Sequence, residues 1–257
     1  MTPGIRVGVF GAAGRMGSTV CSAIEAAEGL DLVAVVDPFA AGRVTHGLEI
    51  AADPKVMADA GVQVAVDFTV AEAARTNLGW CALHGVHAVV GTTGLSDEDQ
   101  RDLASMFTSS NCLLAANFAI SAVLMMRFAE LAAPFFETAE IIELHHDRKT
   151  DAPSGTALAT ARRMAAASPE WAVDPTTHEV VPGSRGGEGP GGLRIHAVRM
   201  RGMMAHQEVV LGAEGQTLTI RQDSYDRSSF MPGVVLACRK VGELPGFTVG
   251  LESALGL

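Results

Sequence analysis

The sequence predicts an α/β protein, with an N-terminal Rossmann-type parallel sheet and a second α+β domain on a mixed or antiparallel sheet. Over the first 116 residues, short and continuously apolar strand segments alternate with helical segments. This pattern is typical of a parallel sheet covered on both faces. Three strand-like segments then follow one another between residues 193 and 221, which favours antiparallel pairing. With 257 residues, the chain is long enough to give both domains a core.

The elements are expected in the following order. In the first domain, strands are predicted at 5–10, 32–36, 62–68, 88–90 and 112–116, with helices up to 27, at 72–84 and at 96–109. Beyond them, a helix is predicted at about 121–131, a strand at 139–144, a helix at 157–167, and strands at 193–200, 206–211 and 216–221. The segment 231–241 is apolar on most sides and needs a partner, so we expect it to return to the first domain.

Composition narrows the classes of partner. A formal net charge of −10 argues against nucleic acid or an anionic membrane, because both need a basic face. The most apolar window, 112–126, is shorter than the roughly 20 residues of a membrane span. No signal peptide is evident. The four cysteines form no metal-binding spacing and suit reduced thiols in the cytoplasm, and no metal site is expected; they are Cys21, Cys81, Cys112 and Cys238.

The first strand-to-helix turn predicts a dinucleotide site. Glycines at 11, 14 and 17 permit a tight turn and close approach of a pyrophosphate to backbone N–H groups. Asp37 ends the second strand, where an acid can accept hydrogen bonds from ribose hydroxyls. The loop 91–94 follows a strand at the same rim, although it could be an ordinary βα loop, and the segment 115–118 ends the next strand, near the expected position of the nicotinamide. The expected cofactor-binding residues are Gly11, Ala12, Ala13, Gly14, Arg15, Met16, Asp37, Gly91, Thr92, Thr93, Ala115, Ala116, Asn117 and Phe118.

The segment 143–156 contains the candidate catalytic residues. His145, His146 and Lys149 lie close together in an otherwise acidic chain. They are followed by Ser154, Gly155 and Thr156 at a helix start, where free N–H groups can bind an anion. Proton donors next to an anion site fit an acidic substrate. The alternative is a solvated basic surface next to an ordinary helix cap.

These motifs together resemble the 4-hydroxy-tetrahydrodipicolinate reductase (dihydrodipicolinate reductase) family. The likeness rests on the segments 11–17, 91–94, 115–118, 143–149 and 151–157. The resemblance implies that a cyclic dicarboxylate is reduced with NADH or NADPH in diaminopimelate and lysine synthesis. It implies His145 as general acid/base, Lys149 as proton donor, and His146, Ser154, Gly155 and Thr156 as substrate-binding. It also implies a homotetramer formed through the second-domain sheet.

Two residues depart from the family pattern. Ala116 stands where the family usually has a proline, and Ser121 stands where it usually has a glycine. Both lie at the expected junction between domains rather than among the proton donors. The expected division is a dinucleotide-binding domain at 1–116, a substrate-binding and oligomerisation domain at 117–227, and a C-terminal return at 228–257.

The sequence is compatible with two cofactors and with more than one class of function. Asp37 would repel the 2′-phosphate of NADPH, whereas Arg15 would attract it, so both cofactors are expected, with NADH modestly preferred. One alternative is another two-domain dehydrogenase that acts on an amino acid or a sugar. Another is a sensor that binds a dinucleotide without catalysis, which would not need both His145 and Lys149.

Overall fold

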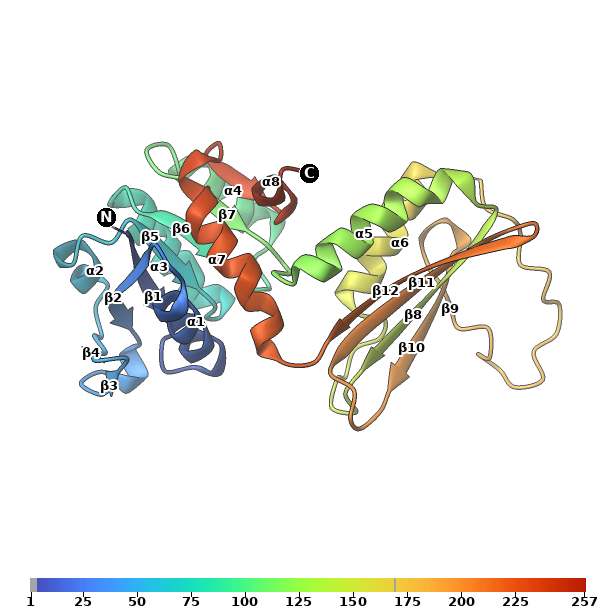
Figure 1. The fold of residues 1–257 in the computed structure, drawn as a ribbon, viewed down its shortest axis with the longest axis horizontal. Coiled ribbons are helices and arrows are strands. Elements are labelled where there is room, and N and C mark those ends of the chain that lie inside the picture. Colours follow the sequence, from blue (N-terminus) through green and yellow to red (C-terminus); the bar gives the residue numbers. More distant parts are fainter. Residues whose placement is uncertain (1–3, 169) are drawn as a thin grey trace. The chain divides into compact units, whose positions relative to one another are not determined.

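The computed structural model describes residues 4–168 and 170–257. The chain forms two compact units (Figure 1). The first unit consists of Met1–Ile120 and Arg227–Leu257, and the second unit is Ser121–Asp226. Each unit is built on a sheet of its own.

The first unit has the predicted parallel sheet. All strand pairs in this six-stranded sheet are parallel, and the strand order is β13-β7-β6-β5-β1-β2. The direction of strand order reverses between β1 and β5, which is where sheets of this kind bind ligands beyond the carboxyl ends of the strands. The strands are β1 (Ile5–Phe10), β2 (Leu30–Val36), β5 (Val64–Asp67), β6 (His87–Val90), β7 (Cys112–Leu114) and β13 (Phe247–Val249).

Helices pack on this sheet through apolar faces. The first, α1, buries Val20, Cys21 and Ile24, whose spacing places them on one side of a helix. A capping box between Ser96 and Asp99 begins α4. The C-terminal α7 belongs to the first unit and contacts α1. The helices are α1 (Arg15–Ala26), α2 (Lys55–Asp59), α3 (Ala71–Leu83), α4 (Asp97–Met106), α7 (Met231–Lys240) and α8 (Glu252–Leu255).

Some elements of the first unit differ from the sequence prediction. A small hairpin of β3 (Val44–Thr45) and β4 (Leu48–Glu49) was not expected. Its turn places both His46 and Gly47 at positive φ, 50° and 72°. The strand β13 also went unpredicted, and it extends the sheet by pairing with β7.

The second unit has a mixed sheet in the order β12-β11-β8-β10-β9. The strands β8 and β10 are parallel, and the other pairs are antiparallel. The predicted turn between β11 and β12 is present, with Gly215 at φ 74°. The strands are β8 (Thr138–His145), β9 (Gly187–Glu188), β10 (Arg194–Arg199), β11 (Ala205–Ala213) and β12 (Gln216–Ser224).

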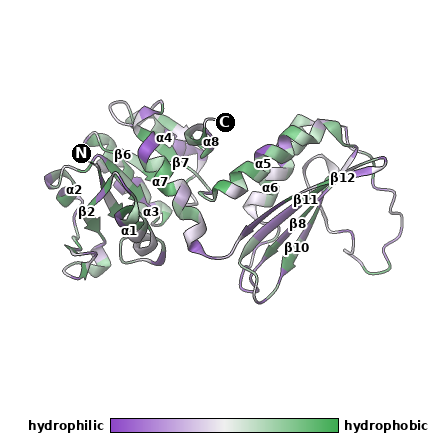
Figure 2. Ribbon diagram, viewed as in Figure 1, coloured by the Kyte–Doolittle hydropathy of each residue, from purple (hydrophilic) through white to green (hydrophobic). Residues whose placement is uncertain are grey.

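The helices of the second unit are α5 (Ile120–Ala132), which is hydrophobic along most of its length (Figure 2), and α6 (Gly155–Ala167).

The two faces of the second-unit sheet differ in burial. Ile141, Glu143 and Val209 are fully buried on the face toward α6. The same face carries Gln207, whose amide donates to Thr160 Oγ1 of α6 at 2.8 Å. On the opposite face, Ile142 and Val210 are only partly buried, and the segment around Trp171 lies over part of this face, so the face is open along the rest of its length.

Candidate active site

The glycine turn after β1 has the geometry of an anion site. Gly11 has φ +67°, which favours glycine. A Cβ on Gly17 would lie 2.0 Å from the Gly11 carbonyl oxygen, so Gly17 serves the packing of α1 against the turn. The N-cap residue of α1 is Gly14, which has no side chain to accept hydrogen bonds from the first N–H groups of the helix. The first N–H groups of α1 are therefore suited to a pyrophosphate.

Asp37 lies beside this turn, as its position at the end of β2 implies. Its Oδ2 accepts a hydrogen bond from the Ala13 amide at 3.1 Å, and its Oδ1 accepts one from the Phe39 amide at 3.1 Å. Both carboxylate oxygens are thereby held by the backbone. The side chain of Arg15, at the start of α1, is exposed. The fold thus brings the residues expected to bind the pyrophosphate and adenosine to one place.

The loops after β5, β6 and β7, which carry Phe68, Gly91 and Phe118, lie together at the same rim. The rings of Phe68 and Phe118 are 5.4 Å apart. A Cβ on Gly91 would lie 2.0 Å from the Phe68 ring, so this glycine permits close packing. Thr92 is 4% exposed and donates to Asp67 at 2.7 Å.

Burial limits what some expected cofactor residues can offer. Ala12, Ala115 and Phe118 are each 1% exposed, so only their backbone groups are suited to contact a ligand. Thr93 and Ala116 are exposed.

In the second unit, a buried carboxylate orients the first histidine. His145 is the last residue of β8, and its Nδ1 bonds to Oε2 of Glu143, whose side chain is fully buried. Because the carboxylate accepts, Nδ1 carries the proton and Nε2 remains for proton transfer. The His145 side chain keeps 17% of its surface exposed.

Glu143 also joins three parts of the second unit. Arg199 of β10 binds it bidentately, with Nη1 and Nη2 at 2.9 and 2.7 Å, and the Ser154 amide donates to it at 3.1 Å. Arg199 Nη2 further donates to the Asp151 carbonyl oxygen at 2.7 Å. Burial is the largest influence on the pKa of Glu143 and raises it. The hydrogen bonds from His145 and Arg199 together outweigh burial and hold this pKa at about 2.

The loop after His145 holds the other basic candidates. Lys149 Nζ forms an ion pair with Asp151 at 2.7 Å, and this pair lowers the pKa of the aspartate. Lys149 is 20% exposed and Asp151 is 63% exposed, so solvent reaches both. His146 Nδ1 is buried and has no hydrogen-bond partner within the described residues. His146 therefore has a polar group to offer a ligand.

The helix start has a clear division of roles. Ser154 Oγ accepts from the Ala157 amide at 3.2 Å, and the Ser154 amide is taken by Glu143. Ser154 is 4% exposed and caps α6, and its predicted role in substrate binding stays a prediction. At Gly155, a Cβ would meet nothing within 4 Å. The helix start is therefore open at Gly155.

Sequence reasoning missed Glu143, Arg199 and Asp67 as parts of these sites. Acidic residues at strand ends are common, and only the pairing of distant strands shows which of them are buried. Among the described residues, no group of three or more His, Cys, Asp or Glu is placed to hold a metal ion. No helix in that part of the chain is both long and apolar enough to cross a membrane.

Comparison with known families agrees with this geometry. The family described as dihydrodipicolinate reductase, N-terminus, matches residues 5–118, and its C-terminus counterpart matches residues 121–255. The chain belongs to the dihydrodipicolinate reductase family. Two relatives named 4-hydroxy-tetrahydrodipicolinate reductase, from Thermobifida fusca and Corynebacterium urealyticum, are 52% and 48% identical. The alignments cover 98% of this chain and 100% and 99% of the relatives.

Solved structures separate this family from its neighbours. A dipicolinate-bound dihydrodipicolinate reductase from Paenisporosarcina sp. TG-14 has a TM-score of 0.89 at 36% identity, covering 97% of this chain and 99% of that one. An amine dehydrogenase from Mycobacterium smegmatis reaches 0.65 at 14% identity, covering 96% and 95%. A myo-inositol dehydrogenase from Corynebacterium glutamicum reaches 0.63 at 16%, covering 98% and 92%. These two share the fold alone, and the resemblance to dihydrodipicolinate reductases is confirmed.

Proposed function

We propose that the protein catalyses the NAD(P)H-dependent reduction of 4-hydroxy-tetrahydrodipicolinate to tetrahydrodipicolinate in diaminopimelate and lysine biosynthesis. One observation carries the proposal within the second unit. A single buried carboxylate, Glu143, holds both the imidazole of His145 and the backbone of the loop that begins α6. A proton-transfer group and an anion-binding helix start are therefore fixed to one anchor, as the reduction of a cyclic dicarboxylate requires.

The first unit binds the reductant. A nicotinamide dinucleotide supplies the hydride when bound. The N–H groups of Arg15 and Met16, at the start of α1, hold its pyrophosphate, because the N–H groups of residues 11–14 are bonded to other protein groups. Asp37 accepts hydrogen bonds from its adenosine ribose. Thr92, Thr93 and the 115–118 loop line the rim beyond the switch point. We assign the first unit, which includes the 115–118 loop, to cofactor binding, and the second unit, Ser121–Asp226, to the substrate and to assembly.

The second unit supplies the proton. His145 donates from Nδ1 to Glu143, and this contact stabilises the imidazolium that forms when Nε2 takes up a proton. Lys149, paired with Asp151, serves as proton donor and attracts a substrate carboxylate. We assign His146 to substrate binding; its Nδ1 has no hydrogen-bond partner among the described residues. The amides of Gly155 and Thr156 receive a carboxylate at the positive end of α6. The relative from Paenisporosarcina was solved with dipicolinate, a planar dicarboxylate.

A coupled assay tests the proposal. The substrate is generated by a synthase in the cuvette, and NADH consumption is followed with and without the protein. Turnover on this substrate, with none on amino acids, amines or inositols, is the expected result. The reverse pattern would favour the other two-domain dehydrogenases, and dinucleotide binding without any turnover would favour a sensor.

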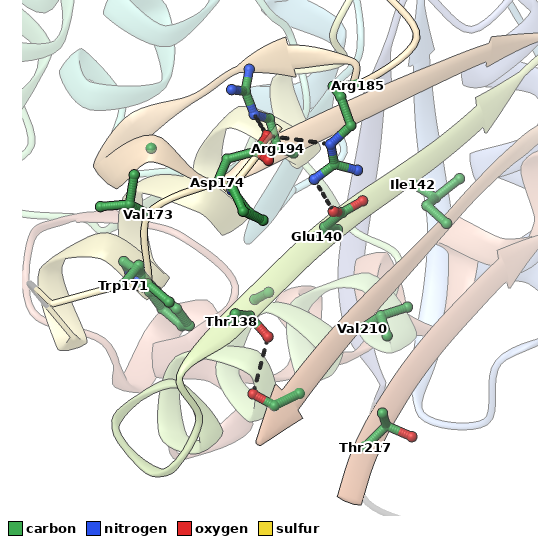
Figure 3. A pocket seen from close by; sticks show the side chains of 15 residues that line it. Thr138, Glu140, Ile142, Trp171, Val173, Asp174, Arg185, Arg194, Val210 and Thr217 are labelled. Carbon is green, nitrogen blue, oxygen red and sulfur yellow. Dashed lines mark hydrogen bonds and ion pairs between the residues drawn. The ribbon is translucent and has the colours of Figure 1, made fainter. Parts of the chain in front are cut away.

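We further propose a homotetramer assembled through the open face of the second-unit sheet. A cavity of about 370 Å³ lies on this face. Figure 3 shows Ile142 and Val210 along it, together with the charge pairs that Asp174 and Glu140 form with arginines. Arg185 bonds Glu140 at 2.6 Å and Asp174 at 3.2 Å, which holds the segment around Trp171 against the sheet. An apolar strip inside a rim of fixed charges is typical of an interface.

The mass in solution tests this assembly. Val210→Asp should lower it below that of a tetramer, measured by light scattering. Leu83→Asp is the matched control, because Leu83 is 82% exposed on α3 of the other unit. A wild-type monomer would refute the proposal.

We also assign the protein to the cytoplasm, because its four cysteines are free and buried and thus suit a reducing compartment.

A further inference from the structure

The first unit contains a buried acidic side chain that the reaction described above does not use. Asp67 ends β5 and is 1% exposed. Its Oδ1 accepts hydrogen bonds from the Thr69 amide at 2.9 Å, the Thr69 hydroxyl at 2.7 Å and the Thr92 hydroxyl at 2.7 Å. Its Oδ2 accepts from the Asn77 amide at 2.8 Å.

All four contacts are donated to Asp67, and all four donors are neutral. Oδ1 accepts from a backbone N–H and Oδ2 from the Asn77 amide, so both oxygens act as acceptors, and we take the group as a carboxylate. Buried carboxylates are normally compensated by a cation. Here the four donors supply hydrogen bonds but carry no positive charge. A net negative charge is therefore held in the interior at the rim of the sheet.

The position of this charge follows from the topology. The strand order reverses between β1 and β5, so the dinucleotide crosses the rim there. The glycine turn and Asp37 follow β1 and β2, which assigns the adenosine to that side. Asp67 ends the first strand on the other side, and its partner Thr92 lies in the loop after β6. The nicotinamide half of the cofactor belongs to this side.

We infer that Asp67 is a positioning residue that acts electrostatically, because its fixed negative charge favours the oxidised, cationic nicotinamide and so promotes hydride release. In hydride transfer, a C–H bond of the dihydronicotinamide breaks and its electron pair moves with the hydrogen to the substrate ring. The nicotinamide ring changes from neutral to a single positive charge. A nearby fixed negative charge stabilises that product and the transition state that leads to it. The inference rests on the proposed dinucleotide site.

The test compares the dissociation constants of NAD⁺ and NADH in the wild type and in Asp67→Asn. Asparagine keeps an oxygen for the three donors at Oδ1, and Asn77 can turn its own amide to accept from the new NH₂ group. The charge is thus removed while the network is kept. The pyrophosphate is the same in both nucleotides, so the ratio of the two constants isolates the charge on the nicotinamide.

The ratio Kd(NAD⁺)/Kd(NADH) should rise about ten-fold in Asp67→Asn, as expected of a unit charge acting over roughly 10 Å near a protein surface. Asp67→Thr, also neutral, provides a second variant if the first does not fold cooperatively. Asn77→Ala is the matched control, because it removes one hydrogen bond and keeps the charge. It should lower the unfolding temperature and leave the ratio unchanged.

The outcomes separate this inference from the proposed function. If wild type binds both nucleotides and the ratio stays constant in both neutral variants, the electrostatic role is refuted and only a structural one remains. If Asn77→Ala shifts the ratio as much as Asp67→Asn, the charge is likewise not the cause. If wild type binds neither nucleotide, the proposed dinucleotide site itself fails.

Discussion

Glu143 and Arg199 form a bidentate ion pair, at 2.7 and 2.9 Å, beneath the loop that carries the basic residues. The carboxylate is fully buried, and the same group orients His145 and holds the Ser154 amide. The pair therefore fixes both the proton-transfer group and the helix start.

Replacing Glu143 with Gln should lower both stability and turnover. Its NH₂ group would face donors on Arg199 and His145, and breaking a buried pair costs about 3–5 kcal/mol. Turnover should fall at least about ten-fold with NADH affinity unchanged, because the imidazole loses its orientation. Denaturant unfolding and steady-state kinetics measure the two effects. A variant as active as wild type would show that the carboxylate does not orient His145.

The low pKa of Glu143 predicts a specific acid sensitivity. A carboxyl group with an ordinary pKa of 4.5, held at about 2 in the folded state, stabilises the fold above pH 4.5. This stabilisation is lost as the pH falls toward 2, and the loss amounts to about 2 kcal/mol by pH 3. The free energy of unfolding of Glu143→Gln should change less than that of wild type between pH 6 and pH 3. Parallel curves for the two proteins would contradict this assignment.

His145→Ala and Lys149→Ala should each lose on the order of 10²–10⁴ in turnover, the range for positioned acid–base groups. NADH binding should stay nearly unchanged, because both residues belong to the second unit. Asp151→Asn is the matched control for Lys149, since it keeps the ammonium and removes only its partner. That variant should keep turnover and bind the dicarboxylate at least as tightly as wild type. Near wild-type turnover in either alanine variant would remove that residue from the mechanism.

Local patterns in the sequence predicted most of the sheet core. The strand at 5–10, the glycine turn and Asp37 follow one another in the chain, so neighbours in sequence carry the signal. In the structure, the Asp37 carboxylate accepts a hydrogen bond from the amide of Ala13, 24 residues away, so Asp37 lies at the glycine turn as that pattern implies. The strand β13 was missed because it has three residues and its pairing with β7 depends on the return of the chain.

The hydrogen-bond partners that hold the site residues in place were less predictable from the sequence. The partner of Glu143 is Arg199, 56 residues later, and the register of β10 on β8 brings them together. Asp67 likewise meets Thr92, 25 residues away, through the pairing of β5 and β6. The sequence predicted that Ser154 lies at a helix start. The hydrogen bond from its amide to Glu143 could not be predicted, because it depends on where β8 lies.

The open space at Gly155 gives a sharp test of the helix start. An added Cβ would meet nothing within 4 Å, so Gly155→Ala should fold and even gain a few tenths of a kcal/mol in helix stability. If a carboxylate binds the amides there, Gly155→Val should raise the substrate KM at least about ten-fold and leave the NADH Kd alone. Pyridine-2,6-dicarboxylate should raise the unfolding temperature of wild type but not of Gly155→Val. An unchanged KM would show that the carboxylate binds elsewhere.

Cofactor preference depends on Asp37 and Arg15. Both Asp37 oxygens are bonded to backbone amides, so the carboxylate cannot turn away from a 2′-phosphate without losing those bonds. Like charges about 4 Å apart repel by roughly 1–4 kcal/mol, whereas the exposed Arg15 can attract the phosphate with comparable energy. Wild type should use both cofactors and prefer NADH by a modest factor. Asp37→Ala should improve kcat/KM for NADPH more than it harms NADH, and Arg15→Ala should weaken NADPH selectively. Strict dependence on NADPH in the wild type would refute the role given to Asp37.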